Sequence, residues 1–139
     1  DHKAEQTISA YFRDLGKAYQ IGNDIANFNG NDGAKLVAGD LARRAPNAVI
    51  ISFVDKLDTD ERMLFEQWYK SGDIKNLATW RERILNSLAI EAASNRMFAT
   101  LDRAEQKAAN LSVELSDVTT PVQKLIFQAC TAACTNPAA

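Results

Sequence analysis

The sequence has little of the residues that most catalytic and metal-binding sites use. Among its 139 residues there is one histidine, His2, and there are two cysteines, Cys130 and Cys134. A nucleophilic serine or cysteine needs a positioned imidazole, and a structural zinc ion needs four ligands, typically cysteine and histidine. No glycine-rich phosphate-binding loop is present either. The sequence therefore predicts no catalytic residue, no metal ligand and no cofactor, and we expect a protein that is not an enzyme.

Long apolar runs and an excess of one charge are also missing. No uninterrupted apolar stretch approaches the roughly 18–20 residues of a membrane-spanning helix. The chain has 16 Lys and Arg and 18 Asp and Glu, which gives a formal net charge of −2. The basic residues are scattered along the sequence and form no large cluster. We therefore expect no membrane span and no nucleic-acid partner. The hydrophobic share of 46% is typical of a globular chain, and the length suits one domain over residues 1–139.

Two groups of polar residues resemble binding sites but are better explained by local structure. Acidic residues gather at Asp55–Glu61, where Asp58 followed three residues later by Glu61 has the form of a capping box at a helix start. Carboxylate chemistry at this cluster is the one enzymatic alternative that stays open. The asparagine-rich segment 27–33 resembles a calcium loop, but it lacks the glycine and the glutamate that such a loop requires. We interpret it as a loop between helices.

Apolar residues recur at steps of three and four along most of the chain, which predicts helices. The first helix carries a stripe from Ile8 to Tyr19, and a second, over 34–44, is expected to turn Leu36, Val37 and Leu41 inward. The β-branched run within 47–57 also suits a buried strand, but no other segment offers it a partner, so we expect a helix from Pro46.

The second half of the chain predicts long helices. The stripe Met97, Leu101, Ala104, Ala108, Leu111 and Leu115 has heptad spacing. An unbroken helix over 77–115 would be about 58 Å long, too long for a compact domain of this size, so we expect a kink or break within 86–95. The last helix is expected to begin at Thr120-Pro121, with Val122, Leu125, Ile126, Ala129 and Cys130 facing inward. The fold class is all-α, a single-domain bundle of five or six helices.

The start of the chain and its cysteines bear on the compartment. The sequence begins at Asp1 without methionine or signal segment, which predicts a mature chain that is secreted or periplasmic after signal-peptide removal. In an exported protein Cys130 and Cys134 are candidates for a disulfide, although a regular helix holds such a pair about 6 Å apart, so the last turn would have to loosen. Two free, packed thiols are the alternative. Asn110 opens a glycosylation sequon, Asn-Leu-Ser, which matters only in a eukaryotic secreted protein.

Large apolar and aromatic side chains are the remaining candidates for function. They either form the core or line an interaction or ligand site, and together with the neighbouring arginines they are Trp68, Tyr69, Trp80, Arg81, Arg83, Met97, Phe98 and Leu101. We expect a non-catalytic, exported protein-binding module, such as an inhibitor, an immunity-type protein or a host-interaction protein. Its partner would be another protein, or a second copy bound through the Met97–Leu115 stripe. One alternative is a carrier of a small apolar ligand, a fatty acid or lipid, held in a cavity that the many alanines leave between helices. A further alternative is an extracytoplasmic sensor domain.

Overall fold

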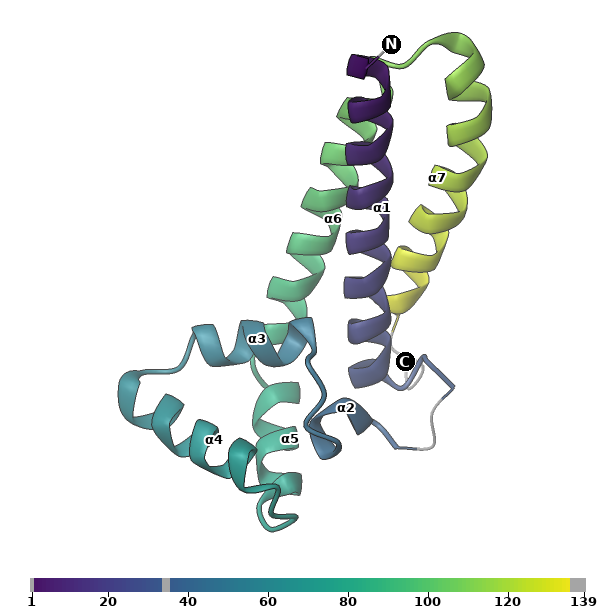
Figure 1. Cartoon of the computed structure of the whole chain (residues 1–139). Helices are drawn as coiled ribbons and strands as arrows, with labels where there is room; N and C mark the ends of the chain where they lie inside the picture. Colours follow the sequence, from purple (N-terminus) through teal and green to yellow (C-terminus); the bar gives the residue numbers. More distant parts are fainter. Residues whose placement is uncertain (1, 34–35, 136–139) are drawn as a thin grey trace.

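The computed structural model describes residues 2–33 and 36–135, and within them every regular element is a helix (Figure 1). The seven helices are α1 (His2–Asn29), α2 (Gly39–Ala42), α3 (Ala48–Asp55), α4 (Thr59–Ser71), α5 (Leu77–Leu85), α6 (Ala89–Ala108) and α7 (Val113–Ala133). The predicted all-α class is confirmed. The described part holds seven helices rather than the expected five or six, because a full break, and not a kink within one helix, separates α5 from α6.

The helices form two parts, which we call the three-helix arm (α1, α6 and α7) and the aromatic unit (α3, α4 and α5). Figure 1 shows the arm as an elongated bundle, in which α6 runs antiparallel to α1 and α7 runs in the same direction as α1. The aromatic unit gathers at the end of the arm where α1 finishes and α6 begins, and α3 packs against α6 there (Figure 1). Short α2 lies beside α5 (Figure 1).

Small residues allow α1, α6 and α7 to approach one another. Ala18 of α1 and Ala93 and Ala104 of α6 are fully buried. A Cβ atom added to Gly22 of α1 would lie 3.4 Å from the Met97 Sδ atom of α6 and 3.6 Å from the Cys130 Sγ atom of α7. The buried alanines therefore serve close helix packing.

The predicted break in the long segment is confirmed, but the stripe after it is divided. Helix α5 ends at Leu85 and α6 begins at Ala89, whose N–H donates to the Ser87 hydroxyl group at 3.1 Å. Met97 and Leu101 lie on α6 and are buried in the core. Helix α6 then ends at Ala108, so the remaining leucines of the stripe fall outside it, Leu111 in the connection and Leu115 on α7. The proposed self-association stripe is thus not one outer surface, because its α6 half is enclosed within the chain's own fold.

The ambiguous segment 47–57 contains a helix, as predicted, but the helix begins at Ala48, two residues after the expected start at Pro46. Asn47 is the N-cap of α3, and its side chain accepts a hydrogen bond from the Val49 N–H. The carboxylate of Asp24 accepts a second, from the Ala48 N–H at 2.8 Å. These two acceptors satisfy N–H groups that have no partner within the helix.

The predicted helix over 34–44 is largely wrong. Its first two residues lie outside the described part, and the rest holds only α2. Ala38 has a positive φ of 58°, a left-handed conformation that cannot continue a helix. Leu41 is buried as expected, whereas Leu36 and Val37 are 45% and 42% exposed.

The N-cap half of the predicted capping box is confirmed, whereas the Glu61 carboxylate accepts a hydrogen bond from Arg83. The Asp58 carboxylate accepts from the Glu61 N–H at 2.8 Å and starts α4, which closes at Gly72 with a positive φ of 67°. The acidic cluster around Asp58 thus includes a working helix cap.

Helix α7 starts seven residues before the predicted Thr120. Ser112 is its N-cap, with the side-chain oxygen facing the Leu115 N–H, and Pro121 lies inside the helix. The helix therefore presents a different side to the core. Of the five residues expected to face inward, Cys130 is buried and Ile126 is partly buried, while Val122, Leu125 and Ala129 are exposed.

Both cysteines are free thiols, so the candidate disulfide is not formed. The regular helix continues to Ala133, and the thiols have separate neighbours: Cys130 donates to the Ala18 carbonyl oxygen, and the Cys134 Sγ atom lies 3.5 Å from the Ser94 hydroxyl oxygen. Burial raises the pKa of the Cys130 thiol to about 11, and the nearby Cys134 adds to the rise. Of the helices in the described part, none is both long enough and apolar enough to cross a membrane.

Candidate functional site

Three of the predicted site residues, Trp68, Tyr69 and Trp80, belong to one aromatic cluster of the aromatic unit, which also contains Phe65. Trp68, Trp80 and Phe65 contact one another, with ring centroids 5.1 Å apart for Phe65 and Trp80 and 6.0 Å apart for the two tryptophans. Both tryptophans are 8% exposed, and the half-buried Tyr69 packs against Phe65 at 5.7 Å. The two tryptophans are therefore part of the core and do not offer a free surface.

Arg44, which follows the short helix α2, packs against this cluster. The Arg44 guanidinium group lies 3.8 Å from the centroid of the Trp68 ring. It also donates to the carbonyl oxygens of Tyr69 at 3.2 Å and of Asp73 at 2.6 Å. Arg44 therefore ties the end of α2 to the end of α4, a structural role.

The other candidates scatter over the molecule. Met97 and Leu101 are buried in the core. Phe98 is partly buried on α6, and its ring centroid lies 6.4 Å from that of Phe127 on α7. Arg81 is partly exposed on α5 and lines none of the pockets described below. Of the eight residues, Tyr69 lines a groove between α3 and α4, and Arg83 lines a larger cleft on the other side of α3.

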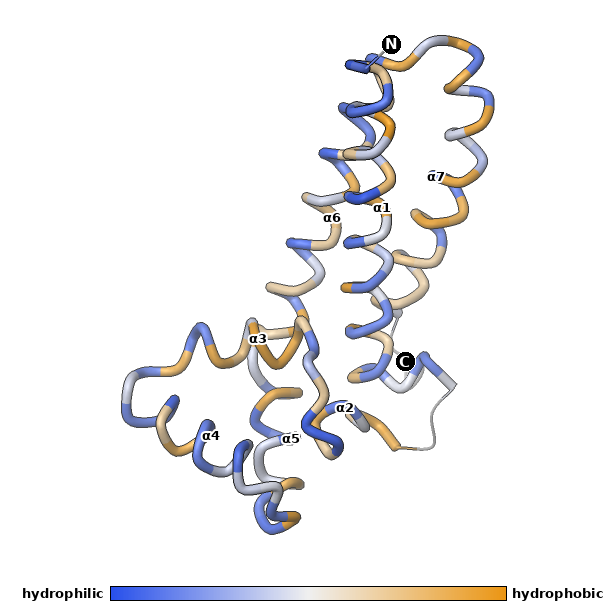
Figure 2. Tube along the Cα trace, viewed as in Figure 1, coloured by the Kyte–Doolittle hydropathy of each residue, from blue (hydrophilic) through white to orange (hydrophobic). Residues whose placement is uncertain are grey.

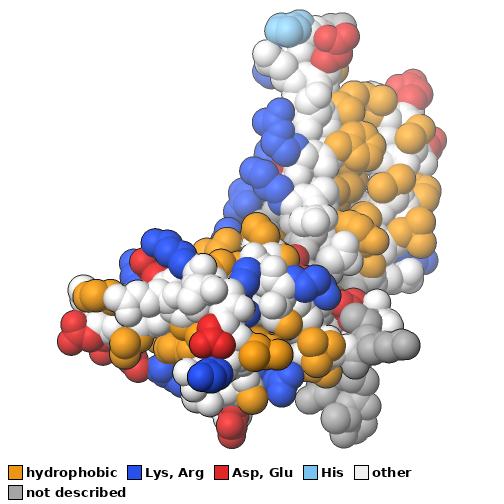
Figure 3. Space-filling model, turned by 60° about the horizontal axis from the view of Figure 1, so that its bottom comes forward, with side chains coloured by type: hydrophobic (Ala, Val, Ile, Leu, Met, Phe, Trp, Pro, Cys, Tyr) orange, Lys and Arg blue, Asp and Glu red, His pale blue; other side chains and the backbone are white. Residues whose placement is uncertain are grey.

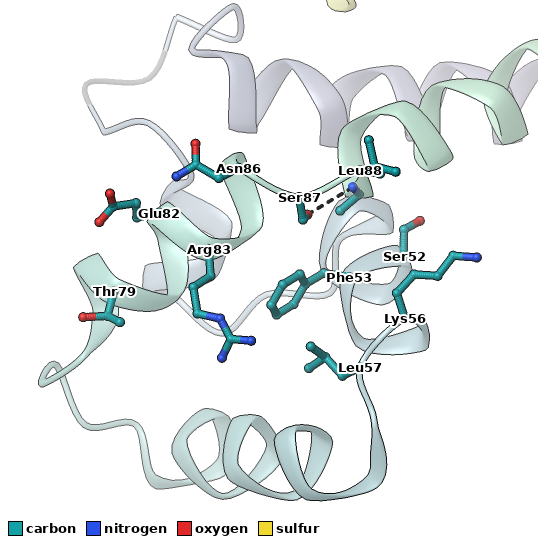
Figure 4. A pocket seen from close by; sticks show the side chains of 11 residues that line it. Ser52, Phe53, Lys56, Leu57, Thr79, Glu82, Arg83, Asn86, Ser87 and Leu88 are labelled. Atoms are coloured by element: carbon teal, nitrogen blue, oxygen red, sulfur yellow. Dashed lines mark hydrogen bonds between the residues drawn. The ribbon is translucent and has the colours of Figure 1, made fainter.

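The cleft lies between α3, α5 and the start of α6 and has a volume of about 770 Å³ (Figure 4). Its apolar lining consists of Phe53, Leu57, Leu88 and Ala89. Its polar lining consists of Ser52, Lys56, Thr79, Glu82, Arg83, Asn86 and Ser87. The Phe53 ring lies in the middle of the view with Arg83 and Leu57 beside it, while the Glu82 carboxylate is turned away from that ring (Figure 4). A volume of this size and a mixed lining are typical of small-molecule sites.

Arg83 is held at the edge of the cleft by two kinds of contact. Its guanidinium group lies 4.8 Å from the Trp80 ring centroid, and it donates to the Glu61 carboxylate at 2.5 Å. Both partners of this ion pair are about 40% exposed, so solvent weakens the pair and the arginine can exchange partners at small cost.

A second candidate is an exposed apolar face on the three-helix arm, which we call the apolar face. It consists of Phe12 and Tyr19 on α1 and Val118, Val122 and Leu125 on α7, with exposed fractions of 43%, 43%, 64%, 36% and 65%. Figure 2 shows the hydrophobic residues along α7, and Figure 3 shows hydrophobic side chains gathered along the side of the arm. Isolated exposed apolar residues are normal, but a contiguous set is a feature of interaction surfaces.

Helical spacing and one shared pocket place these residues on the same side of the arm. Val118, Val122 and Leu125 follow one another at steps of four and three, and Ala129 continues the row. Ala129 and Tyr19 line one shallow pocket where α1 and α7 meet. The Tyr11 hydroxyl group, which donates to the Thr119 carbonyl oxygen at 3.3 Å, helps to hold α7 against α1.

Sequence reasoning missed the apolar face because it assigned the apolar residues of 120–133 to the core. The one signal in the sequence is that this segment is apolar around more than one third of the helix, more than a single packing stripe needs.

Comparison of the chain with protein-family models, with curated proteins and with solved structures finds no match. Within the described residues, no group of three or more histidine, cysteine, aspartate or glutamate side chains is arranged to hold a metal ion.

Proposed function

We propose that this chain is a non-catalytic protein-binding module and that the apolar face on α1 and α7 is its binding surface. The observation that carries the proposal is that five large apolar side chains from two helices remain exposed on one side of the arm. Burying such side chains is favourable by roughly 1.5–3 kcal/mol each when they leave water completely, so covering this face would stabilise a complex.

The shape of the arm favours an amphipathic helix as the partner segment. Helices α1 and α7 run in the same direction side by side, and α6 lies on the other side of α1 in the view of Figure 1. A fourth helix lying along α1 and α7 would complete a four-helix bundle, and apolar residues at steps of three and four would match the spacing of the face. None of the five residues of the face is charged. We therefore expect a partner helix whose contacting side is uncharged.

The experiment compares two leucine-to-lysine variants. Leu125→Lys places a charge on the apolar face, and Leu64→Lys places the same charge on α4, where the leucine is 60% exposed against 65% for Leu125. A photo-crosslinking residue at Val122 captures the partner from the organism that makes the chain, and titration of the purified partner gives the affinity. We expect Leu125→Lys to weaken binding at least about tenfold and Leu64→Lys to leave it unchanged.

A partner that binds Leu125→Lys as tightly as the unchanged protein would overturn the proposal, as would the absence of any adduct specific to position 122. Sedimentation equilibrium of the purified chain tests whether the partner is a second copy. In that case Leu125→Lys, and not Leu64→Lys, shifts the equilibrium to the monomer.

The more specific functional classes are proposals that need measurements of their own. We keep an exported inhibitor, immunity-type or host-interaction protein as the preferred class, with a sensor domain as an alternative. Fractionation of the producing cells, with detection of the chain outside the cytoplasm, tests the exported location.

A carrier of a small apolar ligand is the second candidate function. The α3–α5 cleft favours it, because its apolar lining is open to solvent and its volume is in the range of ligand sites. The cleft lies at a different place from the expected one, since the alanines of α6 pack against neighbouring helices.

A further inference from the structure

We propose that the cleft between α3 and α5 recognises the carboxylate group of a small apolar acid, an inference that rests on the second candidate function. The carboxylate would lie at the corner formed by Ser52, Lys56 and the N-terminus of α6. The apolar part of the acid would lie against Phe53 and Leu57.

Ser52 is the first observation that points to a ligand. Its side chain is 5% exposed, yet its hydroxyl group forms no hydrogen bond with any described residue. Every fully enclosed polar side-chain atom of the described residues has a hydrogen-bond partner. Because the Ser52 hydroxyl group has none, it is not fully enclosed and meets open space. Ser52 lines the cleft, and the cleft is that space. A hydroxyl group that has no protein partner and opens into a cleft is a ready donor to a bound oxygen.

Lys56 supplies a positive charge beside that hydroxyl group. It follows Ser52 by four residues on α3, so the two side chains lie one turn apart on the same side of the helix. Figure 4 shows both on the same side of α3, with the amino group of the exposed Lys56 directed away from the Phe53 ring. Within the described part of the chain Lys56 has no ion pair, so no carboxylate of these residues already neutralises it.

The start of α6 adds further donors to the same corner. Leu88 is the N-cap of this 20-residue helix, and Leu88 and Ala89 both line the cleft. The Ala89 N–H is bonded to Ser87, and the first bond of the helix ladder comes from the Ala92 N–H. The intervening N–H groups of Ile90 and Glu91 have no partner among the described residues. Unpaired N–H groups and the positive end of the helix dipole both favour an anion.

The remaining charges around the cleft agree with an acid that carries one carboxylate. Arg83 lies on the far side of Phe53 and is paired with Glu61, while Glu82 is turned outward (Figure 4). Glu91, in the first turn of α6, is exposed and does not line the cleft. The corner at Ser52 is therefore the part of the cleft where a positive charge meets unpaired donors.

The experiment measures binding of decanoate and of decanol to the full chain by calorimetry, with variants of both the corner and a control lysine. Lys56→Met removes the charge and keeps most of the stem, and Ser52→Ala removes the hydroxyl group. Lys70→Met is the control, because Lys70 lines a separate apolar groove between α3 and α4. We expect decanoate to bind with one-to-one stoichiometry, Lys56→Met and Ser52→Ala each to weaken it about tenfold, and Lys70→Met to have no effect.

The outcomes separate this inference from the carrier function. If decanoate and decanol bind equally well and Lys56→Met changes neither, the chain carries apolar ligands but does not recognise a carboxylate, and the inference is wrong. If neither compound binds, both the inference and the carrier function are wrong. Weakening by Lys70→Met instead of Lys56→Met would place the site in the other groove and would also overturn the inference. Shifts in the amide resonances of Ser52 and Ala89 on addition of decanoate would support it.

Discussion

A network of polar side chains connects the end of α1 to the start of α3. Asn47 donates to the Asp24 carbonyl oxygen at 3.1 Å and to the Asp40 carboxylate at 2.9 Å, and Asn27 accepts from the Asp40 N–H at 3.1 Å. Asn27 and Asn47 are nearly fully buried, and their hydrogen bonds offset the cost of removing them from water. This network, rather than a hydrophobic contact alone, sets how the aromatic unit meets the arm.

Asp24 makes a pH-dependent contribution to stability. Burial raises the pKa of its carboxyl group, the hydrogen bond from Ala48 opposes the rise, and the charge of Asp40 adds to it. The folded protein therefore binds this proton more tightly than the unfolded chain does. The associated stability is fully present below the ordinary aspartate pKa of 3.8 and is lost as the pH rises through the higher pKa of the folded state.

The variant Asp24→Asn tests this sign. Asparagine keeps an acceptor for the Ala48 N–H but does not titrate. We expect the melting temperature of the variant, relative to that of the unchanged protein, to rise between about pH 3 and about pH 7. Calorimetric melting at both pH values measures it, and a relative melting temperature that falls with pH would contradict the assignment.

The role of Arg44 depends on the planar geometry of its guanidinium group more than on its charge. Arg44→Lys keeps the charge but cannot donate to two carbonyl groups while stacked on Trp68. We expect it to lower the free energy of unfolding by about 1–3 kcal/mol, measured by urea unfolding with tryptophan fluorescence. Arg43→Lys is the matched control, since Arg43 is exposed and, among the residues that the structure describes, pairs only with Asp40 one turn away. Equal unfolding midpoints for the two variants would show that charge alone matters at position 44.

At the scale of the helices, α7 shows how strong local signals mislead. Thr120, Pro121 and Gln123 have the residue types of a helix start, yet eight residues of α7 precede Pro121. Proline inside a helix removes one N–H donor and crowds the preceding turn, a cost that other contacts must offset. On α7 these contacts include the hydrogen bond from Tyr11 to the Thr119 carbonyl oxygen and the burial of Cys130.

Two glycines of α1 have opposite roles, which one substitution distinguishes. A Cβ atom at Gly16 would meet nothing within 4 Å, whereas at Gly22 it would touch Met97 and Cys130. We expect Gly16→Leu to raise the free energy of unfolding by about 0.5–1 kcal/mol, because leucine favours a helix. We expect Gly22→Leu to lower it by about 1–3 kcal/mol, because the side chain would force α6 and α7 away from α1.

Thermal or urea unfolding of the two variants measures these opposite shifts. The substitution and the helix are the same at both positions, so the main difference is packing, because Gly16 is exposed and Gly22 is buried against α6 and α7. Similar effects of leucine at both positions would mean that α6 and α7 do not depend on the close approach at Gly22.

For the whole molecule, the question is whether the arm and the aromatic unit unfold together. Both tryptophans of the chain lie in the aromatic unit, so their fluorescence reports on that part, while far-ultraviolet circular dichroism is dominated by the three long helices of the arm. The packing of α3 on α6 and the hydrogen bond from Ala48 to Asp24 join the two parts. We expect the two signals to give one coincident transition in urea. A fluorescence transition at a lower urea concentration would show two units of separate stability.

The sequence by itself determined the features that depend on neighbouring residues. The all-α class follows from the spacing of apolar residues, and the start of α4 follows from Asp58 and Glu61, because a cap is satisfied within one turn. The break before Ala89 follows from the length that a compact domain allows.

Only the tertiary structure decided which apolar residues are covered. Whether Leu125 or Cys130 faces the core depends on where α7 starts and how it lies on α1, and no local pattern records that. The same holds for the cleft, because Ser52, Lys56 and Ala89 meet only when α3 packs against the start of α6. Burial and surface sites are properties of contacts between distant segments, and these contacts are made by the fold.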